Sequence, residues 1–74
     1  MTQEDLDALN AFIAKYPDWC FSLFCYRLSS PTTYNFAVIH HSALSFGQKS
    51  RRENYKTLAE AIADVVQQME AAGI

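Results

Sequence analysis

Residues 19–41 read WCFSLFCYRLSSPTTYNFAVIHH, two apolar runs separated by the segment 29–32. The first run, 19–28, is rich in aromatic residues and contains neither Gly nor Pro, which favours a strand over a helix. The second run, 33–41, places Tyr34, Phe36 and Val38 on one face of a second strand. Since Ser, Pro and Thr between the runs are typical of a turn, we predict a β-hairpin.

Both faces of the first predicted strand are apolar. Side chains alternate across a strand, so Trp19, Phe21, Leu23 and Cys25 share one face, and Cys20, Phe24, Tyr26 and Leu28 share the other. A sheet covered on one side only would therefore expose aromatic and aliphatic side chains. Such a patch predicts dimerisation or a protein partner.

Helical patterns flank the hairpin on both sides. Thr2 is suited to cap a first helix, which carries apolar residues at Leu6, Leu9, Phe12, Ile13 and Tyr16 and which Pro17 ends. Thr57 and Glu60 have the spacing of a capping box, and the apolar positions that follow them predict a second helix that Gly73 ends. Between the hairpin and this helix, segment 44–48 alternates and predicts a short third strand.

The order α-β-β-(β)-α predicts a small α+β fold, a single domain over residues 1–74 with two helices packed on an antiparallel sheet. Short connections favour both helices on one sheet face, which leaves the other face bare. Two alternatives stay open: the helices divide between the faces, or the loop at 49–56 folds over the open face.

Length and composition exclude several classes of protein. A chain of 74 residues buries only about 60% of the surface that its unfolded form exposes, so a roomy internal substrate cavity is not expected. Every apolar stretch ends well short of the roughly 20 residues of a membrane span, and acidic residues follow Met1 where a signal peptide would be basic. We expect a soluble, cytoplasmic protein that does not bind a membrane.

The cysteines and histidines do not form a recognisable metal site. Cys20 and Cys25 are five residues apart on one predicted strand, so their side chains point to opposite faces, and both thiols are expected to be reduced. His40 and His41 are adjacent on the second strand and are also expected to point apart. Since the chain also lacks a Gly-rich phosphate loop and a nucleophile paired with an oriented base, we predict no enzyme, no metal and no cofactor.

Positive charge gathers in segment 49–56, although the net charge of the chain is −2. Arg and Tyr are enriched at interface hot spots, which makes this segment and the exposed strand aromatics the predicted partner contacts. These predicted contacts are Lys49, Arg51, Arg52, Tyr55, Lys56, Tyr26 and Tyr34. The alternative is nucleic-acid binding, in which the same cations pair with phosphates while Tyr55 stacks on a base.

Two resemblances accompany these patterns. The element order resembles that of the double-stranded RNA-binding domain, which also has basic residues just ahead of its last helix, although here that helix begins after the basic residues, at Thr57. Residues 55–62, YKTLAEAI, are similar to the strand-to-helix junction of many small phage and mobile-element proteins, among them some anti-CRISPR inhibitors. That resemblance implies a stand-alone protein that binds a larger host machine stoichiometrically, and it carries over no functional residue.

Together these features predict a small non-catalytic protein-binding module. We expect a stoichiometric inhibitor or an adaptor of a larger machine of the phage or host-defence type, with a possible homodimer through an exposed sheet face. The alternative is a module that binds nucleic acid, as double-stranded RNA-binding domains do, through the basic loop 49–56.

Overall fold

The computed structural model describes residues 2–27, 31–41, 44–49 and 53–74. Its elements are α1 (Gln3–Lys15), β1 (Cys20–Tyr26), β2 (Thr33–Ile39), β3 (Ser45–Gly47) and α2 (Leu58–Ala71). The chain is therefore a small α+β fold, as predicted, and the third strand is present although it has only three residues. α2 ends two residues before Gly73, whose φ of 82° lies in the left-handed region that glycine accepts without strain.

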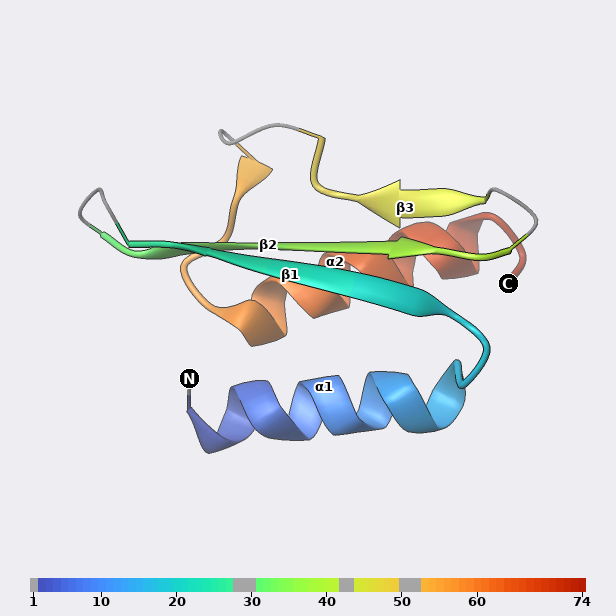
Figure 1. The fold of residues 1–74 in the computed structure, drawn as a ribbon, viewed down its shortest axis with the longest axis horizontal. Helices are drawn as coiled ribbons and strands as arrows, with labels where there is room; N and C mark the ends of the chain where they lie inside the picture. The colour runs from blue at the N-terminus through green and yellow to red at the C-terminus, as the bar shows by residue number, and fades with distance from the viewer. Residues whose placement is uncertain (1, 28–30, 42–43, 50–52) are drawn as a thin grey trace.

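The sheet has the order β1-β2-β3, and all its strands are antiparallel. β1 and β2 pair over their whole length, from Cys20 opposite Ile39 to Tyr26 opposite Thr33, which confirms the predicted hairpin. Figure 1 shows both helices on the same side of this sheet. The prediction that both helices share one sheet face therefore holds, and the alternative in which they divide between the two faces is wrong.

The hydrophobic core lies between the sheet and the two helices. Its buried members are Phe12 from α1, Tyr16 at the C-cap of α1, Phe36 and Val38 from β2, and Leu58, Ala61, Ile62, Val65 and Met69 from α2. The Phe12 and Phe36 rings meet edge to face with centroids 5.2 Å apart, which fixes α1 beneath the hairpin. Burying one such side chain contributes about 1.5–3 kcal/mol, so packing on this side holds the fold together.

Asp5 joins the first turns of the two helices. Its Oδ2 accepts a hydrogen bond from the Thr2 backbone N–H at 3.1 Å, while the Thr2 hydroxyl accepts one from the Asp5 N–H at 3.2 Å. Its Oδ1 accepts from the Ala59 N–H in the first turn of α2, at 2.9 Å. Burial acts to raise the pKa of the Asp5 carboxyl, but the hydrogen bonds from Ala59 and Thr2 outweigh it and hold that pKa below its ordinary value.

Gln48 fixes the end of β3 against the rest of the fold. Its buried side chain accepts from the Phe36 N–H at 2.7 Å and donates to the Ala61 carbonyl at 3.1 Å. It also donates to Asp64 Oδ2 at 3.0 Å. The Gln48 side chain therefore accepts from Phe36 where the backbone of a longer β3 would otherwise do so. The same side chain also joins β2 to α2.

Candidate interaction surface

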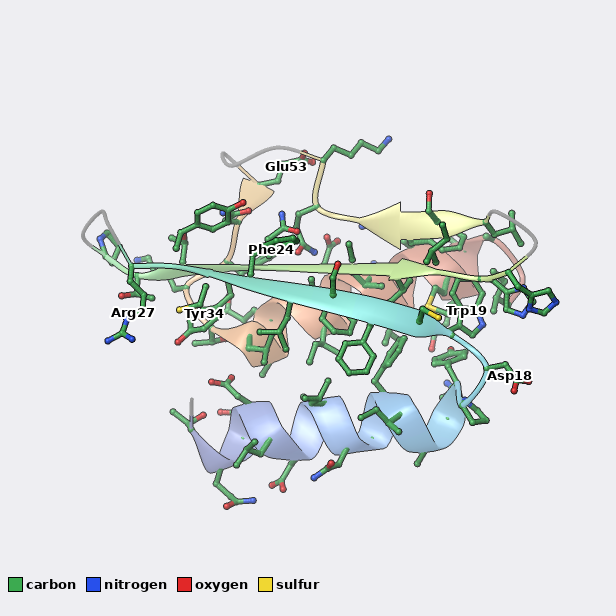
Figure 2. All side chains as sticks on the ribbon, viewed as in Figure 1. Asp18, Trp19, Phe24, Arg27, Tyr34 and Glu53 are labelled. Carbon is green, nitrogen blue, oxygen red and sulfur yellow. The ribbon has the colours of Figure 1, made fainter. Side chains whose placement is uncertain are left out.

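The side of the sheet away from the helices, here called the outer face, is uncharged and partly apolar. It is formed by Cys20, Ser22, Phe24 and Tyr26 of β1, by Thr33, Asn35, Ala37 and Ile39 of β2, and by Ser45 and Gly47 of β3. Phe24 and Ile39 are 52% and 50% exposed, far more than an apolar side chain in a packed layer. Figure 2 shows Phe24 on this side of the sheet and Tyr34 on the helix side.

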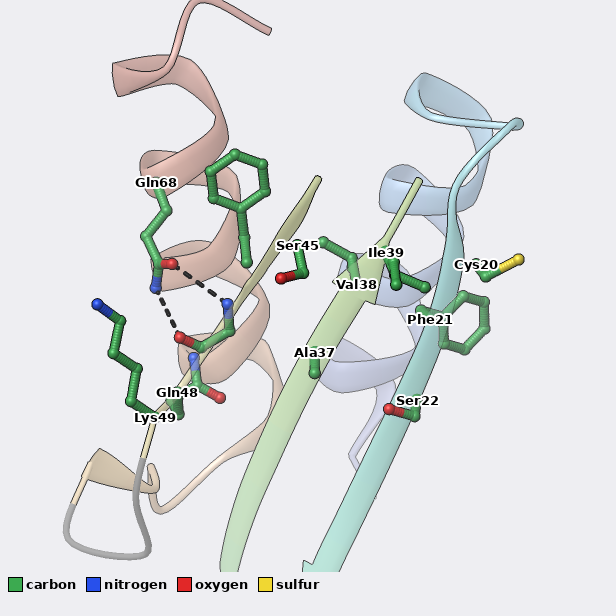
Figure 3. A pocket seen from close by; sticks show the side chains of 12 residues that line it. Cys20, Phe21, Ser22, Ala37, Val38, Ile39, Ser45, Gln48, Lys49 and Gln68 are labelled. Atoms are coloured by element: carbon green, nitrogen blue, oxygen red, sulfur yellow. Dashed lines mark hydrogen bonds between the residues drawn. The ribbon is translucent and has the colours of Figure 1, made fainter. Parts of the chain in front are cut away.

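A groove of about 610 Å³ crosses the outer face near β3. Small residues keep its floor low, above all Ala37 and Gly47, while Ile39 and Lys49 also line it (Figure 3). A Cβ on Gly47 would lie 3.0 Å from both the Ala37 Cβ and the Phe36 carbonyl oxygen, so the groove depends on glycine at this position. Sequence reasoning missed this groove, although a glycine inside a strand is a signal for close backbone approach.

The side chain of Gln68 holds the strand that borders the groove. It donates to the Gly47 carbonyl and accepts from the Gly47 N–H, both at 3.2 Å (Figure 3). Its amide also donates to Asp64 Oδ2 at 3.0 Å. Because α2 thereby fixes both polar groups of Gly47, this part of the outer face is set by the folded structure before any partner binds.

The described residues at both ends of the basic segment 49–56 form hydrogen bonds. At one end the Lys49 N–H donates to Glu53 Oε2 at 3.0 Å. At the other end Tyr55 exchanges two backbone hydrogen bonds with Tyr34, at 2.7 and 3.0 Å. Lys49 and Lys56 are exposed, whereas the predicted contacts Arg51 and Arg52 lie outside the described residues.

The three predicted tyrosines do not lie on one surface. Tyr34 and Tyr55 are half-buried against the core rather than exposed, because Tyr34 shares the helix side of β2 with Phe36. Burial and the Cys25 thiol raise the pKa of the Tyr34 hydroxyl. Burial and nearby carboxylates raise the pKa of the Tyr55 hydroxyl, and Asp64 has the largest effect among those carboxylates. Tyr26 is half-buried on the outer face, with its ring centroid 6.4 Å from that of Phe24. The structure therefore places Tyr26 on the outer face and Lys49 at its rim. Tyr34 lies on the helix side of the sheet, and Tyr55 pairs with Tyr34 through the backbone.

The arrangement of the cysteines matches the prediction, whereas that of the histidines does not. Cys20 lies on the outer face and Cys25 on the helix side, and both are free and exposed. The His40 and His41 rings lie together, with centroids 3.8 Å apart, so the expectation that they point apart is wrong. The reason is that β2 ends at Ile39 and the chain turns there, with the His40 N–H donating to the Leu44 carbonyl at 2.8 Å. Across the described ranges, no cluster of three or more His, Cys, Asp or Glu side chains has the geometry of a metal site.

The chain matches no protein-family model, no curated protein and no solved structure. Its resemblances to double-stranded RNA-binding domains and to small phage proteins therefore stay predictions. In the part of the chain that the structure describes, neither helix is long and apolar enough to cross a membrane.

Proposed function

We propose that this chain is a non-catalytic protein-binding module that works by stoichiometric binding, as an inhibitor or an adaptor, and that it contacts its partner with the outer face. The observation that carries the proposal is the combination of an uncharged sheet face with the half-exposed side chains of Phe24 and Ile39. Exposed apolar residues that gather on one face are typical of protein interaction sites.

The chemistry of the outer face favours a protein over a nucleic acid. Binding to phosphates requires several Lys or Arg side chains on the contact surface, because release of condensed counterions supplies most of the affinity. Among the described residues that line the groove, Lys49 is the one cation, and it lies at the rim. An uncharged surface loses its water at low cost, which suits an apolar side chain of a protein partner.

The shape of the face suggests how the contact is divided. The low floor at Ala37 and Gly47 accepts a protruding side chain of the partner, whereas Phe24 protrudes and supplies an anchor of its own. Interface hot spots have this pattern, in which an aromatic anchor and a small pocket lie close to the centre. Lys49 at the rim then contributes to partner choice and association rate more than to affinity.

Affinity capture from host lysate tests the proposal. The wild-type chain, Phe24→Asp and the control Ile74→Asp are each used as bait, at low and high salt and with nuclease treatment. The control introduces the same charge at an apolar residue that is 39% exposed and whose N–H donates to the Met69 carbonyl of α2. We expect wild type and Ile74→Asp to retain the same protein at high salt after nuclease, and Phe24→Asp to lose it.

Two results would contradict the proposal. Recovery of nucleic acid alone, lost at high salt and after neutralisation of Lys49, Arg51, Arg52 and Lys56, would instead support the RNA-binding prediction. Retention of the same protein by Phe24→Asp, together with its loss from an Arg51→Ala, Arg52→Ala double variant, would move the contact to segment 49–56. Circular dichroism of each variant confirms that the loss of binding is not a loss of fold.

A further inference from the structure

β1 is an edge strand, and the pairing of its neighbour shows which of its backbone groups face outward. In β2, Tyr34 exchanges its backbone hydrogen bonds with Tyr55, and the Phe36 N–H donates to Gln48. The backbone polar groups of Tyr34 and Phe36 therefore point away from β1. In an antiparallel pair, the residue opposite such a position also points its N–H and C=O away from the partner strand. Cys25 lies opposite Tyr34 and Leu23 lies opposite Phe36, so the backbone groups of Cys25 and Leu23 point outward from the sheet edge. Because this direction alternates along a strand, the backbone groups of Phe21 point outward as well.

The sequence of β1 lacks the features that normally protect a sheet edge. Its seven residues, CFSLFCY, contain no charge, no Pro and no Gly. Natural sheets usually guard their edges with a charged side chain, a Pro, a bulge or a very short strand. The opposite edge follows that rule, because β3 has only three residues. The unprotected edge is therefore confined to one side of the molecule.

The flank of α1 below this edge is apolar as well. Lys15 forms an ion pair with Glu70 of α2 at 3.6 Å, so that side of α1 faces α2. Leu6 and Ile13 lie on the opposite flank by helical spacing, and they are 39% and 42% exposed. Figure 1 looks at the molecule from this side, with β1 in front of β2 and α2 and with α1 beneath.

We propose that β1 pairs in an antiparallel manner with β1 of a second copy of this chain, about a two-fold axis at Leu23. This register places Leu23 opposite Leu23 of the second copy, and Phe21 opposite Cys25. Each of the three outward-facing residues then finds an outward-facing partner with which it exchanges two hydrogen bonds. The two sheets join into one, and Leu6 and Ile13 of the two copies lie along the same interface beneath it.

A second copy fits this edge better than an unrelated strand for reasons of symmetry and size. The outward-facing groups at Phe21, Leu23 and Cys25 are centred on Leu23, so the edge is its own complement, as a two-fold interface requires. The side of the molecule seen in Figure 1, with β1 in front, is also its broadest, because the Cα extents are 35 × 26 Å across this side and 19 Å through it. The dimer leaves the outer face open, so this inference does not rest on the proposed function.

The first test measures the mass of the purified chain as a function of concentration by sedimentation velocity. Wild type is compared with Ser22→Lys and with the control Ser45→Lys, which makes the same change at an exposed serine of the outer face on the other edge strand. In the proposed dimer the two lysines at position 22 lie about 7–8 Å apart on the diagonal of the strand pair. We expect Ser22→Lys to raise the dimer dissociation constant by about tenfold or more, and Ser45→Lys to change it by less than about twofold.

The second test checks the register by disulfide formation. In a Cys20→Ser, Cys25→Ser background, Leu23→Cys places one thiol opposite its copy, and we expect a covalent dimer on mild oxidation because paired strand residues fall within disulfide reach. If Leu23→Cys does not fold, a mixture of Ser22→Cys chains and Phe24→Cys chains replaces it. Position 22 lies opposite position 24 in this register, so the mixed dimer is expected to exceed either symmetric one.

Three outcomes would overturn the inference. A chain that remains monomeric at all concentrations has no such interface. A dimer that Ser22→Lys and Ser45→Lys weaken equally, without cross-linking at position 23, is formed by the outer faces instead. Cross-linking of position 22 mainly to position 22 would show a different strand register.

Discussion

Replacement of Asp5 tests whether one carboxylate holds the first turns of both helices. Asp5→Ala removes the acceptor for the Thr2 N–H, and loss of a helix cap costs about 1 kcal/mol. It also leaves the Ala59 N–H without its acceptor 2.9 Å away, which costs about another 1–2 kcal/mol for a partly buried donor. We therefore expect the free energy of unfolding to fall by about 2–3 kcal/mol, a large part of the stability of a domain of this size.

The assay is urea unfolding followed by circular dichroism, with Asp7→Ala as the matched control. Asp7 lies two residues further along α1, is exposed, and accepts a hydrogen bond only from the Gln3 side chain among the described contacts, at 2.9 Å. Its replacement is expected to change the free energy of unfolding by less than about 0.5 kcal/mol. Equal losses for the two variants would refute the role assigned to Asp5.

The pH dependence supplies a second readout for Asp5. Because its pKa in the folded chain lies below the ordinary value, the unfolded chain takes up the proton first as the pH falls. The stability that the carboxylate contributes is complete above the unfolded pKa of about 3.9 and is lost as the pH falls through the lower folded pKa. The gap in unfolding free energy between wild type and Asp5→Asn should therefore narrow between pH 6 and about pH 2.5. A constant gap over that range would show that ionisation of Asp5 does not contribute.

Three further substitutions test how β3 and α2 are held. Gln48→Leu leaves the Phe36 N–H without its acceptor at 2.7 Å, and we expect urea unfolding to show a loss of at least about 2 kcal/mol. Gly47→Ala pushes a Cβ to 3.0 Å from Ala37, and we expect a loss of about 1–3 kcal/mol with a perturbed groove, visible as shifts of the Ala37 methyl signal by NMR. Thr57→Ala removes the hydroxyl that accepts from the Glu60 N–H at 3.2 Å, and we expect a melting temperature about 4–8 °C lower, whereas Thr57→Ser should restore it.

The sequence was sufficient to predict the order of elements because local patterns carry that information. The alternation in 33–39 and the helical spacing after Thr57 each exclude the competing structure. The same alternation places Tyr34 with Phe36 and Val38 on one face of β2, but the prediction that Tyr34 is exposed is wrong, because that face packs against the core. The strand ends were predicted one or two residues too long, because pairing with β3 and the turn at His40, rather than residue preference, decide where β2 stops.

The polar contacts between distant segments could not be predicted in the same way. Asp5 and Ala59 are 54 positions apart, and nothing in the residues around Asp5 distinguishes it from an ordinary acidic residue in a first helical turn. Gln48 looked like part of a polar loop, yet its side chain is buried and bonds to both β2 and α2. Such contacts depend on how the helices are placed against the sheet, which local propensity does not determine.

The separation of core and outer face also connects the two proposals. Because the core packs between the sheet and the helices, side chains such as Phe24 contribute little to folding, and their exposure has to be tolerated for another reason. Pairing through β1 would place two outer faces in one continuous surface, with both Phe24 side chains near its centre and the two grooves further apart. A partner that presents two copies of its own site would then bind much more tightly than one outer face alone allows, since the second contact forms within the complex. Ser22→Lys adds a charge to the outer face as well as to the β1 edge, so it should weaken capture of such a partner more than Ser45→Lys, which charges the outer face away from that edge. Phe24→Asp should abolish capture in monomer and dimer alike.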